Sequence, residues 1–267
     1  MRYQNVCVES IGYTLPSDII TSDAIERHLE PLYARLRLPP GRLELMTGIR
    51  ERRFWNRGTL PSEVSITSGR AALAAAQFDA GKIGALIHGS VCRDHLEPAT
   101  AARVHHGLEL PQQCQIYDVS NACLGILNGM LQIANMIELG QIEAGLVVGT
   151  ESSRQLVETT IAALNRETSL TRQQIKSAVA SLTIGSASCA ILLTNRALSR
   201  TQNRLTAAAV RAHTEHHELC RSGSDEAGVG MSPLMNTDSE TMLHAGVATG
   251  VATFAEFLQA AAWSRDD

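Results

Sequence analysis

Cys123 lies where a reactive cysteine is chemically useful, between a strand-like run and a glycine-containing helical run in DVSNACLGILNGM, residues 118–130. At a helix start, free backbone N–H groups and the helix dipole direct positive partial charge at the sulfur, which favours the nucleophilic thiolate. The same N–H groups are suited to hold the oxyanion of a thioester under attack. Small buried cysteines are also common beside packed helices. Residue type and position therefore leave two interpretations of Cys123, a nucleophile and a core thiol.

A second group of possible ligands lies in HTEHHELC, residues 213–220. It offers His213, His216, His217 and Cys220, whose side chains are of the kinds that bind zinc. The spacing matches neither the helical nor the finger-type zinc motifs, and the stretch is predicted to be a strand running into a loop. We therefore expect no metal here and interpret these histidines as solvated or interface side chains. Cys92 and Cys189 lie in apolar, strand-like runs and are predicted to be core thiols.

The composition excludes several classes of function. The chain of 267 residues is 44% hydrophobic and 19% charged, with a net charge of −4 at pH 7, which is typical of a globular protein with a large core. Because no block of lysines and arginines occurs, we expect neither nucleic acid nor an anionic membrane surface as a partner. The first twenty residues lack the apolar core of a signal peptide, and no apolar run reaches the ~18 residues of a membrane span, so the protein is expected in the cytoplasm. The six cysteines form no CxxC pair and are predicted to be reduced thiols.

The elements that must position Cys123 are strands and helices in alternation. Strands are predicted over 3–16, 48–55, 83–91, 114–120, 144–151, 186–195 and 204–215, and helices over 21–36, 61–78, 97–108, 123–140 and 240–263. The alternation predicts parallel sheets covered by helices. The 123–140 helix has few charges on any face, so we expect it to be enclosed by protein in a layered α/β/α/β/α arrangement. Residues 220–240 are predicted to form a turn-rich loop.

Several motifs together resemble a known family. The stretch DVSNACLGILNGM is preceded by GSVCRDHLEPATAARVHHGLEL and followed by IEAGLVVGTE and LTIGSASCAILLT. In this order they resemble the thiolase-superfamily condensing enzymes, within these the ketoacyl-ACP synthase III group, and most of all its OleA-type branch, which joins two fatty acyl-CoAs head to head. The resemblance runs from about residue 3 to the end of the chain. SVCRDHLEP is the stretch that favours the OleA-type branch.

The resemblance implies a fold and two catalytic residues. It implies the layered thiolase-like α/β/α/β/α fold, with a complete N-terminal half over residues 1–195 and the start of a truncated C-terminal half over 196–267. Cys123 matches the cysteine that accepts the first acyl group. Glu97 matches a glutamate that reaches into the partner subunit's active site and assists deprotonation of the second acyl-CoA, which implies a homodimer. From the residues alone, Glu97 is also an acid that would favour the dipole of the following helix. No cofactor or metal is implied.

Two residues of the family have no match in this chain. In the family, a histidine and an asparagine on later segments bind the second substrate, and no histidine of this chain, His244 included, matches the family's histidine. The sequence therefore leaves three alternatives: a C-terminal segment or second chain completes the enzyme, the chain is a shortened form, or condensation is lost. Three functions also remain open: acyl-CoA condensation to a β-keto acid, which we favour, a synthase III that uses malonyl-ACP, and a non-catalytic subunit of such an enzyme. The arginines of RERRFW, residues 50–55, suit coenzyme A phosphates or an acidic carrier, and equally a solvated strand edge.

Overall fold

A mixed five-stranded sheet organises the computed structural model, which describes residues 1–222 and 235–266. The strand order is β1-β7-β6-β4-β5. These strands are β1 (Val6–Thr14), β4 (Ile83–Gly89), β5 (Gln115–Val119), β6 (Ala144–Glu151) and β7 (Ala187–Asn195). β5 and β6 run parallel to β4, whereas β7 runs antiparallel to both β1 and β6. The prediction of parallel sheets was wrong for β7, because the chain leaves β6 and enters β7 at the same end of the sheet, where Glu151 pairs with Ala187.

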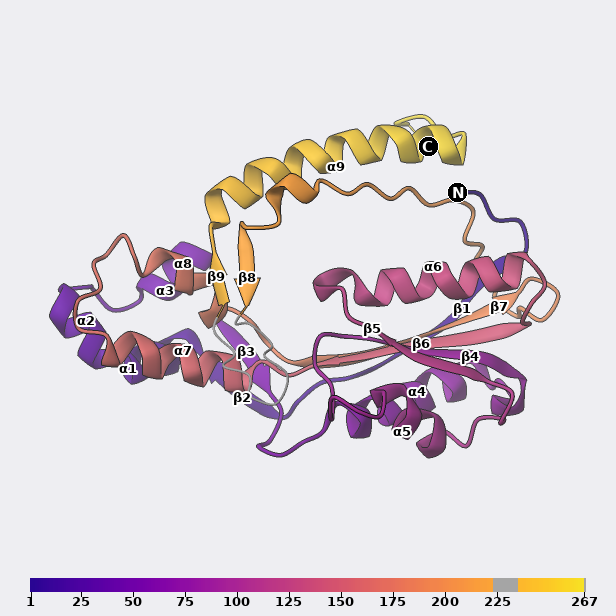
Figure 1. Cartoon of the computed structure of the whole chain (residues 1–267), viewed down its shortest axis with the longest axis horizontal. Coiled ribbons are helices and arrows are strands. Elements are labelled where there is room, and N and C mark those ends of the chain that lie inside the picture. Colours follow the sequence, from indigo (N-terminus) through magenta and orange to yellow (C-terminus); the bar gives the residue numbers. More distant parts are fainter. Residues whose placement is uncertain (223–234, 267) are drawn as a thin grey trace.

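Helices cover both faces of this sheet (Figure 1). α4 (Pro61–Ala76) and α5 (Thr100–Gly107) lie on one face, and α6 (Gly125–Glu138) lies on the other. The predicted 61–78 helix is confirmed. Pro61 occupies its first turn, where the missing N–H costs no hydrogen bond, and the alanine-rich body favours helix.

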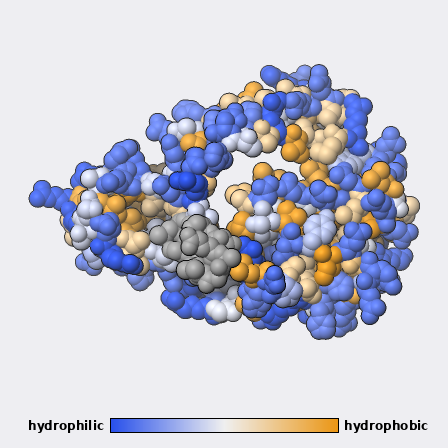
Figure 2. Space-filling model, viewed as in Figure 1, coloured by the Kyte–Doolittle hydropathy of each residue, from blue (hydrophilic) through white to orange (hydrophobic). Residues whose placement is uncertain are grey.

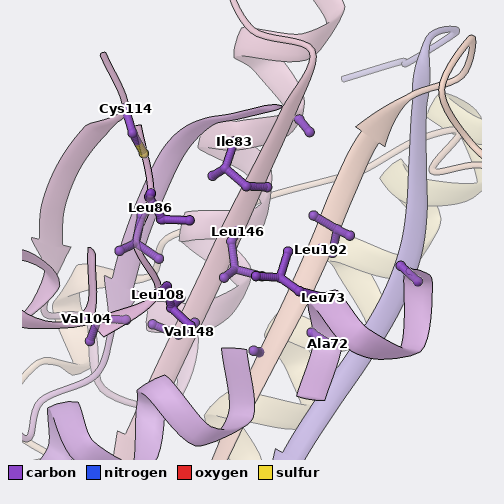
Figure 3. Close-up of a cluster of buried hydrophobic side chains, with 14 residues drawn as sticks. Ala72, Leu73, Ile83, Leu86, Val104, Leu108, Cys114, Leu146, Val148 and Leu192 are labelled. Atoms are coloured by element: carbon purple, nitrogen blue, oxygen red, sulfur yellow. The ribbon is translucent and has the colours of Figure 1, made fainter. Parts of the chain in front are cut away.

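The core is divided by the sheet because successive strand residues point to opposite faces. Leu86 and Leu146 join side chains of α4 and α5, whereas Ile87 and Val147 join those of α6. Figure 3 shows the first of these clusters, with Leu73 of α4 against Leu146 and Leu192 of the sheet. Two apolar clusters therefore fix α4 and α6 on opposite sides of β4 and β6.

α6 is covered on one face only within the described residues. Its buried positions are Gly125, Gly129, Ile133, Ala134 and Ile137, which repeat at helical spacing and face the sheet. Leu124 just before it and Leu127 within it are exposed by 52% and 53%. The expectation of a helix enclosed on all sides is therefore wrong for the described residues, since the sheet covers the inner face and the outer face stays open.

A smaller helical unit extends from one end of the sheet (Figure 1). It contains the two-stranded ribbon of β2 and β3 and the helices α1, α2, α3, α7 and α8, which share a third apolar cluster. The bounds are β2 (Asp18–Thr21), β3 (Glu51–Phe54), α1 (Ser22–His28), α2 (Glu30–Leu36), α3 (Arg42–Thr47), α7 (Arg154–Arg166) and α8 (Lys176–Val179). The predicted single helix over 21–36 is two helices, because Pro31 lacks an N–H and is tolerated only in the first turn of α2. Short 3-10 turns η1 (Ala80–Lys82) and η3 (Ala180–Leu182) complete the connections.

The segment after β7 contains a long helix that does not pack against the sheet. It comprises η4 (Thr214–His216), β8 (Cys220–Ser222), β9 (Met235–Thr237) and α9 (Ser239–Ala261). α9 confirms the predicted final helix, has no buried residue in the described structure, and is separated from α6 by an opening (Figure 2). The predicted strand over 204–215 is wrong. This stretch makes only two isolated bridges, Arg204 with Cys7 and Ala207 with Arg2, and then turns into η4.

Two other predictions concern the same segment. The strand expected in 213–220 is also wrong, because its first half is the η4 turn and β8 begins only at Cys220. Of the loop predicted over 220–240, both ends are strand and residues 223–234 lie outside the described residues. None of the described helices has the length and apolar character that a membrane crossing requires.

Candidate functional site at the start of α6

Cys123 is exposed on the turn that joins β5 to α6. It lies in η2 (Ala122–Leu124), a 3-10 turn in which the Leu124 N–H donates to the Asn121 carbonyl at 2.9 Å, and α6 begins at Gly125. The helix proper thus starts two residues later than predicted. The exposure of Cys123 contradicts the core-thiol interpretation and leaves its sulfur open to a reactant.

Glycines allow this turn and the start of α6 to lie close against the sheet. A Cβ built on Gly125 would lie 2.9 Å from the carbonyl carbon of Gly89, and one built on Gly129 would lie 2.6 Å from a methyl group of Val147. Side chains at these positions would push α6 away from β4 and β6. The glycines of the cysteine motif therefore fix the height of the turn above the sheet.

Glu97 lies on an exposed loop between β4 and α5, three residues before the helix begins. The first N–H groups of α5 are capped by another residue, Asp118 of β5. The Asp118 carboxylate accepts hydrogen bonds from the Thr100 N–H at 2.7 Å and the Ala101 N–H at 2.9 Å. Glu97 therefore does not fill the helix-capping role.

Asp118 is a site residue that sequence reasoning missed. It lies in the cysteine motif itself, five residues before Cys123, and it fixes the end of the loop that holds Glu97. A carboxylate in the strand-like run CQIYDVS was the available signal. No hydrogen bond or ion pair joins Glu97 to Cys123 within the described parts of the chain.

Glu151 holds the other end of the same loop. Its carboxylate accepts hydrogen bonds from the Ser90 hydroxyl at 2.8 Å, the Val91 N–H at 3.2 Å and the Cys92 thiol at 3.2 Å. Burial, followed by the negative charge of Glu151, raises the pKa of Cys92 to about 12. Cys92 is thus a protonated thiol that is only partly buried, and it lies in the loop after β4 rather than in the predicted strand.

His88 is a buried titratable group beneath this loop. Its side chain is fully buried at the end of β4, and neither ring nitrogen has a hydrogen-bond partner. Burial lowers the pKa of His88, and the nearby carboxylates of Asp118, Asp94 and Glu151 oppose that shift. The imidazole is therefore held neutral.

The remaining predicted residues lie away from this turn. Cys189 lies in β7 half-buried, and burial raises the pKa of its thiol. Arg52 of RERRFW is only 5% exposed, and its guanidinium donates to the Ile20 carbonyl at 3.3 Å and the Ser22 hydroxyl at 3.0 Å. Arg53 donates to the Pro16 carbonyl at 2.9 Å. Burial therefore excludes Arg52 from a surface for phosphates.

A depression in the surface of the smaller helical unit lies elsewhere. It measures about 640 Å³ over α1 and α2 and is lined by charged residues, among them Asp23, Arg27 and Arg37. Neither Cys123 nor Glu97 borders it.

Comparisons with known proteins agree with this arrangement. Residues 45–229 match the family of thiolase N-terminal domains. The acyl-CoA:acyl-CoA alkyltransferase of Shewanella oneidensis is 40% identical over 267 residues, which cover 98% of this chain and 76% of that protein. A solved structure of Xanthomonas campestris OleA, a variant with a cysteine replaced by serine and with bound lauric acid and lauroyl-CoA, matches with a TM-score of 0.88 at 30% identity, covering 99% of this chain and 76% of that one.

A more distant group matches a shorter part of the chain. The β-ketoacyl-[acyl-carrier-protein] synthase III of Koribacter versatilis is 32% identical over 114 residues, 43% of this chain and 34% of that protein. The similarity to the alkyltransferases thus extends over nearly the whole chain, whereas the synthase III similarity does not. This chain belongs to the thiolase superfamily of condensing enzymes and, within it, to the OleA-like acyl-CoA:acyl-CoA alkyltransferase family.

Proposed function

We propose that this protein is an acyltransferase that accepts a fatty acyl group from acyl-CoA on Cys123 and takes part in the Claisen condensation of two acyl-CoAs to a β-keto acid. The observation that supports this proposal is the exposed Cys123 thiol in the turn before α6. The related Xanthomonas campestris OleA structure with bound lauroyl-CoA supports a long-chain acyl-CoA as the first substrate.

The first half-reaction is a nucleophilic acyl transfer. The Cys123 thiolate attacks the carbonyl carbon of the acyl-CoA thioester, the carbonyl oxygen becomes an oxyanion, and the bond to the CoA sulfur then breaks. The coenzyme A thiolate leaves and takes up a proton, and the acyl group remains as a thioester on Cys123. The first N–H groups of a 3-10 turn have no acceptor within the turn, so the Cys123 N–H in η2 is suited to stabilise the oxyanion.

The second half-reaction forms a carbon–carbon bond. Removal of a proton from the α carbon of a second acyl-CoA gives a carbanion that attacks the Cys123 thioester, and the cysteine thiolate leaves. Hydrolysis of the remaining CoA thioester yields the β-keto acid. We assign the proton removal to Glu97 of the partner subunit. The supporting observation is that Glu97 is exposed and free of the capping role that Asp118 performs.

The partner subunit is proposed to pair along β5. This strand is the edge of the main sheet, and Ile116 on it is 38% exposed. An open edge with an exposed apolar side chain favours pairing with another strand. In light scattering we expect the chain to be a dimer and Ile116→Lys to be a monomer, whereas Ile19→Lys on the separate β2–β3 ribbon leaves the dimer intact. A monomeric parent protein would contradict this proposal.

Further polypeptide is proposed to cover α6 and α9. Residues 1–195 would then form the half that holds Cys123, and residues 196–267 would begin a second half that needs an additional segment or chain. The support is the exposed apolar side chains of both segments, Leu124 and Leu127 before and on α6 and Leu243, Val251 and Phe254 on α9. Exposed apolar patches of this kind mark interaction surfaces. A chain that stays monodisperse by itself and binds no apolar dye would count against this proposal.

Intact-mass spectrometry after incubation with lauroyl-CoA tests the proposed acylation. We expect one lauroyl adduct, which Cys123→Ala abolishes and Cys220→Ala, at the other exposed cysteine, retains. Absence of an adduct on the parent protein would overturn the proposal and favour a non-catalytic subunit. Condensation is then measured in the presence of any complementing chain, with a second acyl-CoA or with malonyl-ACP. Product from malonyl-ACP alone would indicate a synthase III instead.

A further inference from the structure

The η4 turn gathers three metal-binding side chains on one side. His213, Glu215 and His216 each offer a ligand atom, and these three atoms lie within 4.8 Å of one another. His213 is half-buried, whereas Glu215 and His216 are exposed. Spacings of i, i+2 and i+3 are unusual for a zinc motif on a regular helix, and the 3-10 turn is what brings the side chains together. We propose that His213, Glu215 and His216 bind one divalent transition-metal ion of the zinc class, although the sequence alone led us to expect none.

Thr249 of α9 contacts the ring of His213. The Thr249 hydroxyl lies 2.8 Å from the Ala245 carbonyl oxygen and 2.7 Å from Nδ1 of His213. A hydroxyl that donates to the Ala245 carbonyl accepts a hydrogen bond from Nδ1–H of His213, and that tautomer carries its lone pair on Nε2. Ligating histidines are commonly oriented by such a hydrogen bond from the other ring nitrogen. The contact with Thr249 therefore fixes the orientation of the His213 ring and is compatible with metal binding through Nε2.

The other two ligands are available. Neither the Glu215 carboxylate nor the His216 ring makes a hydrogen bond or ion pair within the described residues. The adjacent His217, in contrast, is occupied: its Nδ1 lies 3.0 Å from the Thr214 carbonyl oxygen and its Nε2 lies 3.0 Å from the Glu218 carboxylate. The turn thus places Glu215 and His216 near His213, whereas the neighbouring His217 interacts with Thr214 and Glu218.

The chemistry of the ligands selects the ion. Two imidazoles and one carboxylate suit Zn²⁺, Co²⁺, Ni²⁺ or Cu²⁺ and leave at least one coordination position for water or another ligand. Bound metal would fix η4 against α9, because His213 contacts Thr249 of that helix. This inference does not depend on the proposed acyl transfer, since none of these residues belongs to the turn that holds Cys123.

Titration calorimetry with Zn²⁺ on the intact chain, freed of metal, tests the site. We expect one ion per chain. The variants His216→Ala and Glu215→Gln are expected to abolish this binding, and Thr249→Val to weaken it by about 10- to 100-fold, as loss of a supporting hydrogen bond does at metal sites. His217→Ala is the matched control in the same turn and should bind as the parent protein does.

Co²⁺ binding distinguishes this site from the exposed thiols. Visible absorption of bound Co²⁺ without a sulfur-to-cobalt charge-transfer band is the expected result, because the proposed ligands are nitrogen and oxygen. A charge-transfer band, or zinc binding that survives His216→Ala, would overturn the proposal. Equal loss in His217→Ala and His216→Ala would also overturn it, since that pattern describes weak binding by any surface histidine.

Discussion

The backbones of Gly89 and Gly125 lie in direct contact where β4 ends and α6 begins. A Cβ built on Gly89 would lie 2.6 Å from both the carbonyl carbon and the carbonyl oxygen of Gly125. The obstructing atoms are backbone atoms, so a side chain at either position forces a shift of the helix. The contact therefore sets the position of the turn that holds Cys123.

The variant Gly125→Ala should displace the start of α6. Its Cβ would lie 2.9 Å from the Gly89 carbonyl carbon, and we expect a loss of ~1–3 kcal/mol in the free energy of unfolding, as overpacking typically costs. Urea unfolding measures the stability, and intact-mass spectrometry measures acylation of Cys123, which should fall as well. The control is Gly246→Ala on α9, where a Cβ meets nothing within 4 Å. Equal stability of the parent protein and Gly125→Ala would contradict the close contact.

The cysteines should differ sharply in their reaction with iodoacetamide. Cys123 and Cys220 are exposed, whereas burial raises the pKa of Cys114 to about 11 and that of Cys92 to about 12. A raised pKa leaves less thiolate at mildly alkaline pH, and only the thiolate reacts. Peptide mapping should therefore find Cys123 and Cys220 modified first, with all six cysteines modified in denaturant. Rapid labelling of Cys92 in the folded protein would be inconsistent with the structure.

The variant Glu151→Gln should loosen the loop that holds Glu97. The carboxylate accepts three hydrogen bonds from residues 90–92, and an amide would turn a donor toward one of these groups. We expect faster hydrogen–deuterium exchange across residues 90–98. The pKa of Cys92 should fall from about 12, because the negative charge of Glu151 contributes to the shift, but it should stay raised because burial is the larger cause.

A matched control for this variant is Glu143→Gln, an exposed position just before the opposite end of β6. It should leave both the exchange of residues 90–98 and the thiolate titration of Cys92 unchanged. If the two variants behave alike, the loop is not held by Glu151.

The main sheet was predictable because its strands are local sequence features. β4, β6 and β7 are apolar runs bounded by turns, and α4 has a proline at its start and an alanine-rich body. The direction of β7 was not predictable, since it depends on where the long excursion through α7 and α8 returns to the sheet. The exposure of the outer face of α6 was not predictable for a related reason. An apolar helix sequence indicates that other residues cover the helix, but it does not indicate which residues these are.

The position of Cys123 between a strand and a helix was predictable, and the surroundings of this candidate site were less so. The cysteine follows a strand and precedes a helix, which is a local pattern. Asp118 and Glu151 act across neighbouring strands, and their partners in the loop after β4 become visible only when β5 and β6 are paired with β4. The proximity of His213, Glu215 and His216 was not predictable for the same reason, because the turn conformation and the contact of His213 with Thr249 are tertiary features.

The buried His88 should make the free energy of unfolding depend on pH. Burial lowers its pKa from the ordinary value of 6.5, and both ring nitrogens lack partners, so the folded protein holds the imidazole neutral. Below about pH 6.5 the unfolded chain binds a proton that the folded chain does not. The free energy of unfolding should therefore fall with decreasing pH, by at most ~1.4 kcal/mol per pH unit from this group, and should be independent of it above that range.

The contribution of His88 is isolated by comparing urea unfolding of the parent protein and His88→Gln at several pH values. The variant removes the titrating group, so its stability should decline less steeply between neutral and acid pH, while the carboxylates common to both proteins cancel in the difference. His244→Gln on the exposed surface of α9 is the control and should keep the parent's slope. Identical slopes for the parent protein and His88→Gln would show that the buried imidazole takes up its proton as readily in the folded chain as in the unfolded one.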